Sequence, residues 1–265
     1  MKLQDKVAII TGGSRGIGKA VAKEFVKEGA KVMLAARTEE ALKATAEELQ
    51  ASYTVCDVAN EEQPKNLIQQ TLDKLGKIDI VVTAAGIQKP LGRFHELSLQ
   101  EWKKTIDINL MGTVNVIHAA LPHMQQGSVI TLAGAGVPKA FPNFSAYSTS
   151  KIAIIQLITN LAEEYPNIRF NAIAPGPVNT QFTDEVLRAG PEVVGQEFYD
   201  KNIAWQKGEQ GAVSPGIAAE FMVRLVSGEI NCTGKYLSAV WDKEFDTNPD
   251  MYTLKRIDGR NFGKK

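Results

Sequence analysis

Short runs of apolar residues alternate with longer amphipathic stretches along almost the whole chain of 265 residues. A continuous apolar run such as residues 7–10 is typical of a strand that is buried on both faces, as in a parallel sheet. We expect strands at residues 7–10, 31–36, 53–56, 78–82, 128–132, 169–173 and 236–238. We expect helices at residues 19–29, 39–50, 61–75, 98–123, 147–164 and 215–227. Repeated strand–helix units with right-handed crossovers predict an α/β fold, a doubly wound parallel sheet with helices on both faces and ligands at the carboxyl ends of the strands.

Two segments depart from this alternation. Residues 180–207 have weaker and irregular patterning, and residues 242–265 have poor periodicity and a basic end. Because no linker or repeat interrupts the rest, we expect one domain over residues 1–241, followed by a C-terminal tail of uncertain order. The tail is compatible with three roles, which the sequence leaves open: covering a neighbouring subunit, covering the mouth of a substrate site, or forming a loosely ordered terminus.

The first predicted strand runs into a glycine-rich turn with Gly12, Gly16 and Gly18. Glycines let the backbone approach a ligand closely, and the free N–H groups at a helix N-terminus favour phosphate. Residues 13–19 also resemble the phosphate loop of nucleotide triphosphatases, but the next residue, Ala20, has no hydroxyl for magnesium. We therefore favour a dinucleotide site, with a tight strand–helix corner as the structural alternative.

Composition and charge exclude several classes of partner. Lys and Arg number 30, as do Asp and Glu, so no net charge attracts nucleic acid or an anionic membrane. No apolar run approaches the roughly 20 residues of a membrane span. Cys56 and Cys232 are not spaced as C-x-x-C and the three histidines are scattered, which argues against a disulfide framework or a metal site. We expect a cytoplasmic protein.

The end of the second predicted strand indicates which dinucleotide would bind. In such sites an acidic residue there binds the ribose 2′-hydroxyl, whereas a nearby arginine accommodates a 2′-phosphate. Here the acid position is Ala36, Arg37 follows it, and Arg15 lies inside the glycine turn. Two arginines and no carboxylate predict NADP(H), with NAD(H) as the alternative; each arginine taken alone is equally well explained as a solvated surface residue.

Tyr147 and Lys151 are the candidate chemical groups. They are four residues apart on a predicted helix and therefore share one face. A tyrosine with its ordinary pKa of about 10 is a poor acid or base, but a neighbouring cation favours the phenolate. Such a pair is suited to give a proton to a carbonyl oxygen as hydride reaches the carbon.

Together these motifs resemble those of the short-chain dehydrogenase/reductase family. The matching residues occur in the order usual for the family: Thr11, Gly12, Gly16, Gly18, Asp57, Val58, Thr83, Ala84, Ala85, Gly86, Asn109, Tyr147, Lys151, Pro175 and Gly176. The resemblance implies a single Rossmann-type domain, assembled as a homodimer or homotetramer through two long helices, here residues 102–123 and 147–164. It also implies an NADP-dependent oxidoreductase acting on a small carbonyl or alcohol substrate.

The resemblance implies specific roles for residues of this chain. The cofactor would be bound by Gly12, Ser14, Arg15, Gly16, Ile17, Gly18, Arg37, Asp57, Val58, Ala85, Gly86, Tyr147, Lys151, Pro175, Gly176 and Thr180. Lys151 would hold the nicotinamide ribose and lower the pKa of Tyr147. Asn109, through a helix irregularity and a water molecule, would connect Lys151 to solvent, and Thr180 would contact the carboxamide. Taken without the family, Asn109 is explained as a polar residue inside a helix and Thr180 as a helix cap.

The chain departs from the family pattern at two places. Thr83 stands where asparagine is usual, a mild change because threonine can still form a hydrogen bond to the backbone. The serine that normally lies 13 residues before the tyrosine is replaced by Gly134, with Ala133 beside it. Loss of one such donor typically costs about 10²–10³ in rate. The nearest hydroxyls belong to Thr131 and Ser145, while backbone N–H groups of residues 133–136 or a donor on the substrate are further replacements.

Two functions follow from these features. The first is an NADP(H)-dependent carbonyl reductase or alcohol dehydrogenase with Tyr147 as general acid/base, and the second is a catalytically impaired NADP-binding sensor or interaction module. Residues 181–207 are predicted to form a lid over the substrate, although packing on their own domain also explains their apolar side chains. These side chains are Phe182, Val186, Leu187, Phe198, Tyr199 and Trp205. The opposite wall is expected at Leu91, Phe94 and His95.

Overall fold

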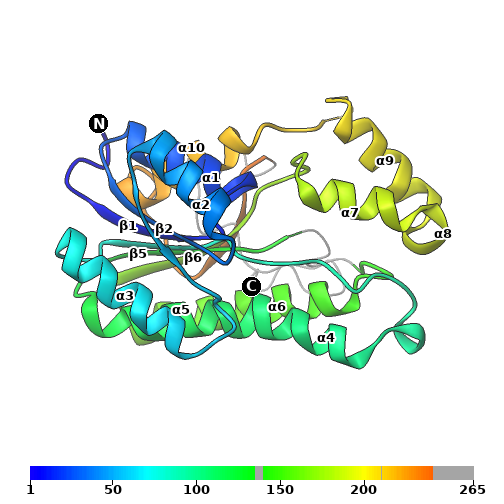
Figure 1. The fold of residues 1–265 in the computed structure, drawn as a ribbon, viewed down its shortest axis with the longest axis horizontal. Helices are drawn as coiled ribbons and strands as arrows, with labels where there is room; N and C mark the ends of the chain where they lie inside the picture. Colours follow the sequence, from blue (N-terminus) through cyan, green and yellow to red (C-terminus); the bar gives the residue numbers. More distant parts are fainter. Residues whose placement is uncertain (135–139, 210, 241–265) are drawn as a thin grey trace, which may run out of the picture.

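The computed structural model of this chain describes residues 1–134, 140–209 and 211–240 (Figure 1). The expected domain boundary at residue 241 and the tail at residues 242–265 lie outside the described residues, so both stay predictions. Among the described helices, none is long and apolar enough to cross a membrane. The cytoplasmic location also stays a prediction.

One parallel sheet organises the described part of the chain. Its seven strands run in the order β3-β2-β1-β4-β5-β6-β7, and every neighbouring pair is parallel. The strands are β1 (Val7–Thr11), β2 (Lys31–Ala36), β3 (Ser52–Val55), β4 (Ile80–Thr83), β5 (Gly127–Leu132), β6 (Ile168–Ala174) and β7 (Lys235–Ser238). This order, with β1 beside β4, confirms the predicted doubly wound α/β fold and creates a switch in strand order beside β1.

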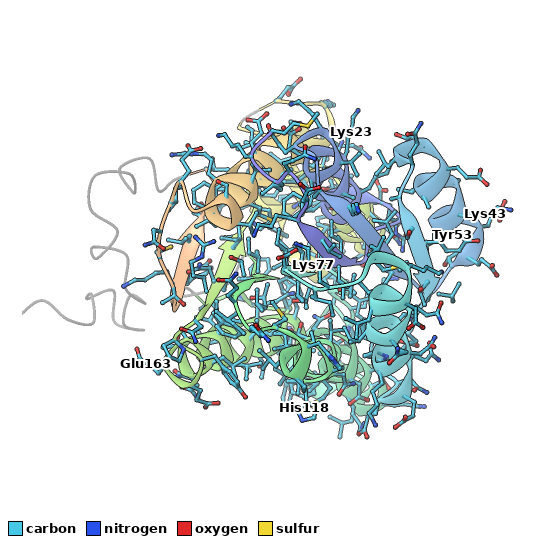
Figure 2. All side chains as sticks on the ribbon, turned by 90° about the vertical axis from the view of Figure 1, so that its left-hand side faces the viewer. Lys23, Lys43, Tyr53, Lys77, His118 and Glu163 are labelled. Carbon is cyan, nitrogen blue, oxygen red and sulfur yellow. The ribbon has the colours of Figure 1, made fainter. Side chains whose placement is uncertain are left out.

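Helices cover both faces of the sheet, as predicted (Figure 1). One face carries α1 (Gly16–Lys27), α2 (Glu39–Leu49) and α10 (Pro215–Ser227), whose apolar side chains form a buried core with alternate residues of β1, β2 and β4. The other face carries α3 (Glu62–Leu75), α5 (Gly112–Ala120) and α6 (Ser145–Glu164), which bury the remaining strand residues. Charged side chains such as Lys23, Lys43 and Glu163 point outward from these layers (Figure 2).

The helix predicted at residues 98–123 is continuous but changes its winding. Ser98 accepts a hydrogen bond from Glu101 N and starts α4 (Leu99–Ile106). A π-helical turn, η2 (Asp107–Met111), follows before α5, and the last turn, η3 (Leu121–His123), is 3₁₀. The π turn inserts one extra residue per turn and so re-aims the side chains that it carries, which include Asn109.

Residues 181–206, predicted to be irregular, form three short helices. They are α7 (Gln181–Ala189), α8 (Pro191–Val194) and α9 (Gln196–Gln206). Gly190 and Gly195, which separate them, have φ of 82° and 86°, values that favour glycine. These two breaks explain why no single periodicity runs through the segment. The three helices form a lobe at one end of the molecule, beyond the carboxyl ends of the strands (Figure 1).

The first helix and fourth strand begin elsewhere than expected. Helix α1 starts at Gly16 rather than at residue 19, so part of the glycine-rich segment belongs to the helix. Strand β4 starts at Ile80 rather than at residue 78, and just before it the Asp79 carboxylate accepts a hydrogen bond from Val7 N at 2.8 Å.

Candidate active site

A single deep cleft lies along the carboxyl ends of β1, β2, β4, β5 and β6. Its volume is about 1270 Å³, and it is lined by residues of the loops that follow those strands and by the helical lobe. Every residue predicted to bind the cofactor lines this cleft: Gly12, Ser14, Arg15, Gly16, Ile17, Gly18, Arg37, Asp57, Val58, Ala85, Gly86, Tyr147, Lys151, Pro175, Gly176 and Thr180. The fold therefore brings together residues that are as far as 168 positions apart (180 − 12).

The glycine turn is shaped by close backbone packing. Gly12 has φ of 67°, and a Cβ on it would lie 2.8 Å from the carbonyl carbon of Ala84. A Cβ on Gly18 would overlap the carbonyl oxygen of Gly12. Glycine is thus required for the turn to fit between the start of α1 and the loop after β4.

The N-terminus of α1 is suited to an anion. The first helical hydrogen bond joins Lys19 N to the carbonyl of Arg15, so the amides of Gly16, Ile17 and Gly18 precede the bonded ladder. In the described structure no side chain caps this end, and its first turn contains no acidic residue. Since the same three residues line the cleft, free N–H groups and the helix dipole are both available to a pyrophosphate.

The far end of the cleft collects the residues expected near the adenosine. Arg15, Ala36 and Arg37 line it together, with no acidic residue at the end of β2. On the neighbouring wall, Asp57 is held by a turn in which its carboxylate accepts from Ala59 N at 3.1 Å. Two guanidinium groups and one fixed carboxylate thus frame this end of the cleft.

Tyr147 and Lys151 meet at the floor of the same cleft. Both belong to α6, they are 7% and 5% exposed, and the Lys151 nitrogen lies 5.7 Å from the centre of the Tyr147 ring. Lys151 Nζ donates a hydrogen bond to the carbonyl of Leu132 at 2.7 Å. The edge of the Tyr147 ring faces Phe182 of the lobe, with ring centres 6.0 Å apart.

Burial disfavours the charged form of both groups. It raises the pKa of the Tyr147 phenol above its ordinary value and lowers the pKa of the Lys151 ammonium to about 8. This direction is opposite to the lowering of the Tyr147 pKa by Lys151 that the family resemblance implies, and that lowering stays a prediction for the cofactor-bound enzyme. The pKa of the phenol rises because a phenolate would lose its water shell on burial, and the cation expected to offset this loss is itself penalised.

Asn109 takes its position from the π turn and fastens the loop after β4. Its side chain is fully buried, accepts from Ile87 N and donates to Ile87 O, both at 2.8 Å. It also donates to Ser150 Oγ at 3.0 Å, and Ser150 Oγ donates to the carbonyl of Tyr147 at 2.6 Å. The helix irregularity expected at Asn109 is present, whereas a link to Lys151 stays a prediction.

The break after β6 completes the cleft. Gly176 has φ of 88°, and a Cβ there would lie 2.5 Å from a methyl group of Val240. Thr180 caps α7 by accepting a hydrogen bond from Phe182 N at 3.3 Å, and its methyl group lies 3.8 Å from the position of a Cβ on Gly16. Thr180 is thus a helix cap and also a lining residue, which brings the lobe to the glycine turn.

Comparison with known proteins agrees with this geometry. A family model described as short chain dehydrogenase matches residues 6–190. The chain belongs to the short-chain dehydrogenase/reductase family. The resemblance inferred from the motifs is thereby confirmed, and the protein is an oxidoreductase of this family.

Individual relatives in this family are similar over most of their length. L-fucose dehydrogenase from Bos taurus is 32% identical over 241 residues, which cover 88% of this chain and 87% of that protein. Ligand-free aldohexose dehydrogenase from Thermoplasma acidophilum has 32% identity and a TM-score of 0.77, over 90% of this chain and 94% of that one. Carveol dehydrogenase from Mycobacterium avium, in complex with NAD, has 26% identity and a TM-score of 0.78, over 89% and 96%. These similarities support a nicotinamide cofactor.

At the family's serine position the short-chain dehydrogenase has no room for a side chain. A Cβ on Gly134 would overlap the hydroxyl of Tyr147 and lie 2.8 Å from its Cζ. The Tyr147 hydroxyl therefore rests directly against the Gly134 backbone. Of the replacements considered, Thr131 is buried without a hydrogen-bond partner for its Oγ1, and Ser145 Oγ accepts from Trp102 Nε1 at 3.1 Å. Residues 135 and 136 lie outside the described residues.

Thr83 does not substitute for the asparagine usual in this family. Its Oγ1 is buried and has no hydrogen-bond partner in the described structure, so the expected bond to the backbone is absent. Thr83 lies in register with Thr11 and Thr131 of the neighbouring strands, and Thr131 Oγ1 is likewise buried without a partner in the described structure.

The lobe and residues before α6 form an aromatic chamber next to Tyr147. Phe141 stacks on Phe144 with ring centres 4.1 Å apart, and Phe198 packs edge-on against Phe141 at 5.1 Å and against Trp205 at 6.0 Å. The cleft-facing residues among those predicted for a lid are Phe182, Val186, Phe198 and Trp205. Leu187 and Tyr199 are not in the cleft wall, and Tyr199 packs in the cluster around Phe144.

The wall predicted opposite the lid is wrong. Phe94 is 62% exposed, and neither it nor His95 lines the cleft. Both belong to the short 3₁₀ turn η1 (Phe94–Glu96), which lies outside the chamber. Leu91 packs against the aromatic cluster without reaching the cleft. The wall is instead formed by Phe141 and by Gln88, since the loop after β4 enters the chamber immediately after Gly86.

Gln88 and Asn202 are among the lining residues that were not predicted from the sequence, as are Phe141 and Asn179. Gln88 follows a strand end by only a few positions, and Asn202 lies four residues after Phe198 on one helix face. Both signals are present in the sequence, but neither residue belongs to a motif. Within the described residues no group of His, Cys, Asp or Glu side chains is arranged to hold a metal ion.

The contact between Gly134 and Tyr147 predicts non-additive stability. We expect Gly134→Ala to lower the free energy of unfolding by about 1–3 kcal/mol, because the added methyl group displaces the Tyr147 hydroxyl. Tyr147→Phe removes the overlapping atom and should restore part of that loss in the double variant. Urea denaturation of the two single variants and the double variant measures the coupling. Gly216→Ala, whose Cβ would meet only the Ser214 Oγ at 3.3 Å, is the matched control; strict additivity at 134 and 147 would contradict the contact.

Burial of Lys151 predicts a pH-dependent stability. Its pKa is about 8 in the folded protein against an ordinary 10.5, so between these values the unfolded chain binds a proton that the folded chain has lost. Stability should therefore rise with pH across this window, while the full penalty applies below pH 8. We expect the advantage of Lys151→Met over wild type to shrink by about 1–2 kcal/mol between pH 7 and pH 9.5 in urea titrations. Exposed Lys23→Met serves as the control, and parallel curves for Lys151→Met and wild type would refute the prediction.

Proposed function

We propose that this protein is an NADP(H)-dependent oxidoreductase that transfers hydride between the nicotinamide and a carbonyl or secondary alcohol of a small molecule. One observation carries the proposal. The buried pair of Tyr147 and Lys151 lies in the same continuous cleft as the uncapped N-terminus of α1 and two arginines. The glycine turn would hold the cofactor in the same cleft in which Tyr147 would serve as proton donor.

The residues of the chain divide the work between binding and proton transfer. When bound, NADPH supplies hydride to the carbonyl carbon. Tyr147 gives its proton to the carbonyl oxygen, and its raised pKa keeps the phenol protonated at neutral pH, which suits the direction of reduction. Lys151 is placed to bind ribose hydroxyls and to return a proton to Tyr147, and we assign Asn109 to the path by which that proton arrives from solvent.

The preference for NADP(H) rests on charge. Arg15 and Arg37 line the adenosine end of the cleft, and Ala36 replaces the acid that would repel a 2′-phosphate. Charge-assisted hydrogen bonds to a phosphate contribute about 1.5–3 kcal/mol each. Asp57 and Val58 are assigned to the adenine, Ala85 and Gly86 to the adenosine side, Pro175 and Gly176 to the nicotinamide end, and Thr180 to the carboxamide.

A second function, an NADP-binding sensor or interaction module with impaired chemistry, is favoured by one observation only. Gly134 lacks the hydroxyl that would hold the substrate carbonyl, and the nearest candidates, Thr131 and Ser145, are respectively buried in β5 and hydrogen-bonded to Trp102 Nε1. Against this reading, a binding module needs Lys151 for the ribose but has no use for the Tyr147 hydroxyl. We therefore rank the enzyme first.

We also infer that the protein is a homodimer or homotetramer assembled through α4, α5 and α6. Support comes from exposed apolar side chains on α4, on α6 and on the π turn before α5. Leu99, Met111 and Ile152 are 70%, 39% and 43% exposed. Exposed large apolar side chains gathered in one patch are typical of an interface between subunits.

Turnover with a panel of ketones, aldehydes and quinones tests the catalytic proposal. We expect oxidation of NADPH, followed by its absorbance, and a loss of at least about 10²-fold in kcat in Tyr147→Phe with little change in NADPH affinity. Tyr165→Phe, at the exposed end of α6, should keep full activity. If Tyr147→Phe turns over as fast as wild type, Tyr147 is not the general acid/base. If wild type binds NADPH but turns over no compound of the panel, the sensor function is favoured instead.

The cofactor preference has its own test. We expect Arg37→Ser to weaken binding of NADPH about 10- to 100-fold while binding of NADH changes less than about 3-fold, because only NADPH has the 2′-phosphate. Arg15→Ser should act in the same direction, and exposed Lys23→Ser on α1 should change neither affinity. Fluorescence titration of both cofactors measures the ratio. An equal loss for the two cofactors would show that Arg37 does not contact the 2′-phosphate.

A further inference from the structure

Two amide side chains are buried in the wall of the chamber beside Tyr147. Gln88, in the loop after β4, is 5% exposed, and Asn202 of α9 is 3% exposed. Both line the cleft, so what remains exposed of each faces the chamber. Burying amides this deeply among Phe141, Phe198 and Trp205 lowers the stability of the fold unless their polar atoms form hydrogen bonds.

The orientation of each amide is fixed by its partner. Gln88 Nε2 donates to the carbonyl of Phe182 at 2.6 Å, and Asn202 Nδ2 donates to the carbonyl of Phe198 at 2.8 Å. A carbonyl oxygen only accepts hydrogen bonds, so the NH₂ group must point to it in both cases. The amide oxygens, Gln88 Oε1 and Asn202 Oδ1, are consequently the atoms that remain for a ligand.

These oxygens have no donor within the described protein. Neither Gln88 Oε1 nor Asn202 Oδ1 accepts a hydrogen bond there, in contrast to Asn109, whose oxygen and nitrogen are both paired. Each is therefore an acceptor held in a fixed place. In such a site, a ligand that brings a hydroxyl gains a bond, and a ligand without one leaves a buried oxygen unpaired.

The rest of the chamber defines the charge and shape of that ligand. Among the described lining residues the charged ones are Arg15, Arg37, Asp57 and Lys151, and the first three lie at the adenosine end. Among the described residues beyond Tyr147, the wall is aromatic and aliphatic apart from neutral polar side chains, and it carries no cation to hold a carboxylate or phosphate. A neutral molecule with an apolar face fits this surface.

We propose that the substrate is a neutral, ring-sized hydroxylated ketone or alcohol, whose hydroxyl groups donate to Gln88 Oε1 and Asn202 Oδ1 while its ring packs on Phe198 and Trp205. This inference rests on the proposed oxidoreductase function and narrows it. It makes Gln88 and Asn202 specificity-determining residues, and it gives the chamber the ability to reject analogues in which a methyl group replaces a hydroxyl. The donor on the substrate also offers a way to orient the carbonyl without the family's serine.

Matched ligand pairs test this inference by binding as well as by turnover. 4-Hydroxycyclohexanone and 4-methylcyclohexanone have similar size, and each is titrated by calorimetry into the complex of the protein with NADP⁺, which has no hydride to give to a ketone. We expect the hydroxylated ketone to bind at least about 10-fold more tightly and to show the larger kcat/KM. Because this ketone has one hydroxyl proton to donate, it uses one of the two oxygens at a time. Gln88→Met or Asn202→Leu, whichever removes the acceptor in use, should reduce this ratio to about 1, and the double variant should do so in either case.

The control separates specificity from damage to the chamber. Phe198→Leu removes aromatic surface without changing an acceptor, so it should weaken both ketones alike and leave their ratio unchanged. Equal binding of the two ketones to wild type, or binding of neither, overturns the inference. Since binding is measured separately from turnover, a hydroxyl preference without NADPH oxidation would support the inference while refuting the oxidoreductase proposal.

Discussion

The close approach of three backbone segments at one corner of the sheet is the constraint on which the site depends. Gly12 and Gly18 let the glycine turn and the start of α1 press against the loop after β4, where a single Cβ would overlap main-chain atoms. That packing fixes where the free amides of α1 point. It also fixes the start of the loop that continues through Ile87 into the chamber. The anion site and the substrate wall therefore both depend on this packing.

The surroundings of Tyr147 and Lys151 disfavour the charged forms of both groups. Tyr147 and Lys151 are both buried, and among the described residues no carboxylate or guanidinium stabilises the charged form of either group. Burial keeps the phenol protonated and makes the Lys151 ammonium easier to deprotonate, so hydrogen bonds from a bound ligand would favour the charged forms. The missing side chain at Gly134 lets the phenol sit directly against the backbone.

The sequence predicted the sheet and the cofactor end of the cleft because both depend on short local patterns. Buried strands produce apolar runs, and phosphate loops need glycines. The glycine turn with Gly12 and Gly18 can therefore be predicted from the sequence. The substrate end depends instead on how distant segments meet. Phe94 looked suitable by residue type but lies in an exposed turn, while Gln88 and Asn202 acquire their meaning only from carbonyl partners on the lobe. The unpaired hydroxyl of Thr83 was equally hidden, because it follows from strand register rather than from residue type.

The amide of Gln88 has both a structural and a ligand-binding role. Its nitrogen fastens Phe182 at the start of the helical lobe, and its oxygen faces the chamber. The preceding residue, Ile87, is held by Asn109 through two hydrogen bonds. Any substitution of Gln88 that suits a new ligand also removes the hydrogen bond to Phe182 O, which joins the loop after β4 to the helical lobe. Divergence toward other substrates should therefore be easier on the α9 side of the chamber, where Asn202 bonds only within its own helix, than at Gln88, where a change requires a compensating one elsewhere.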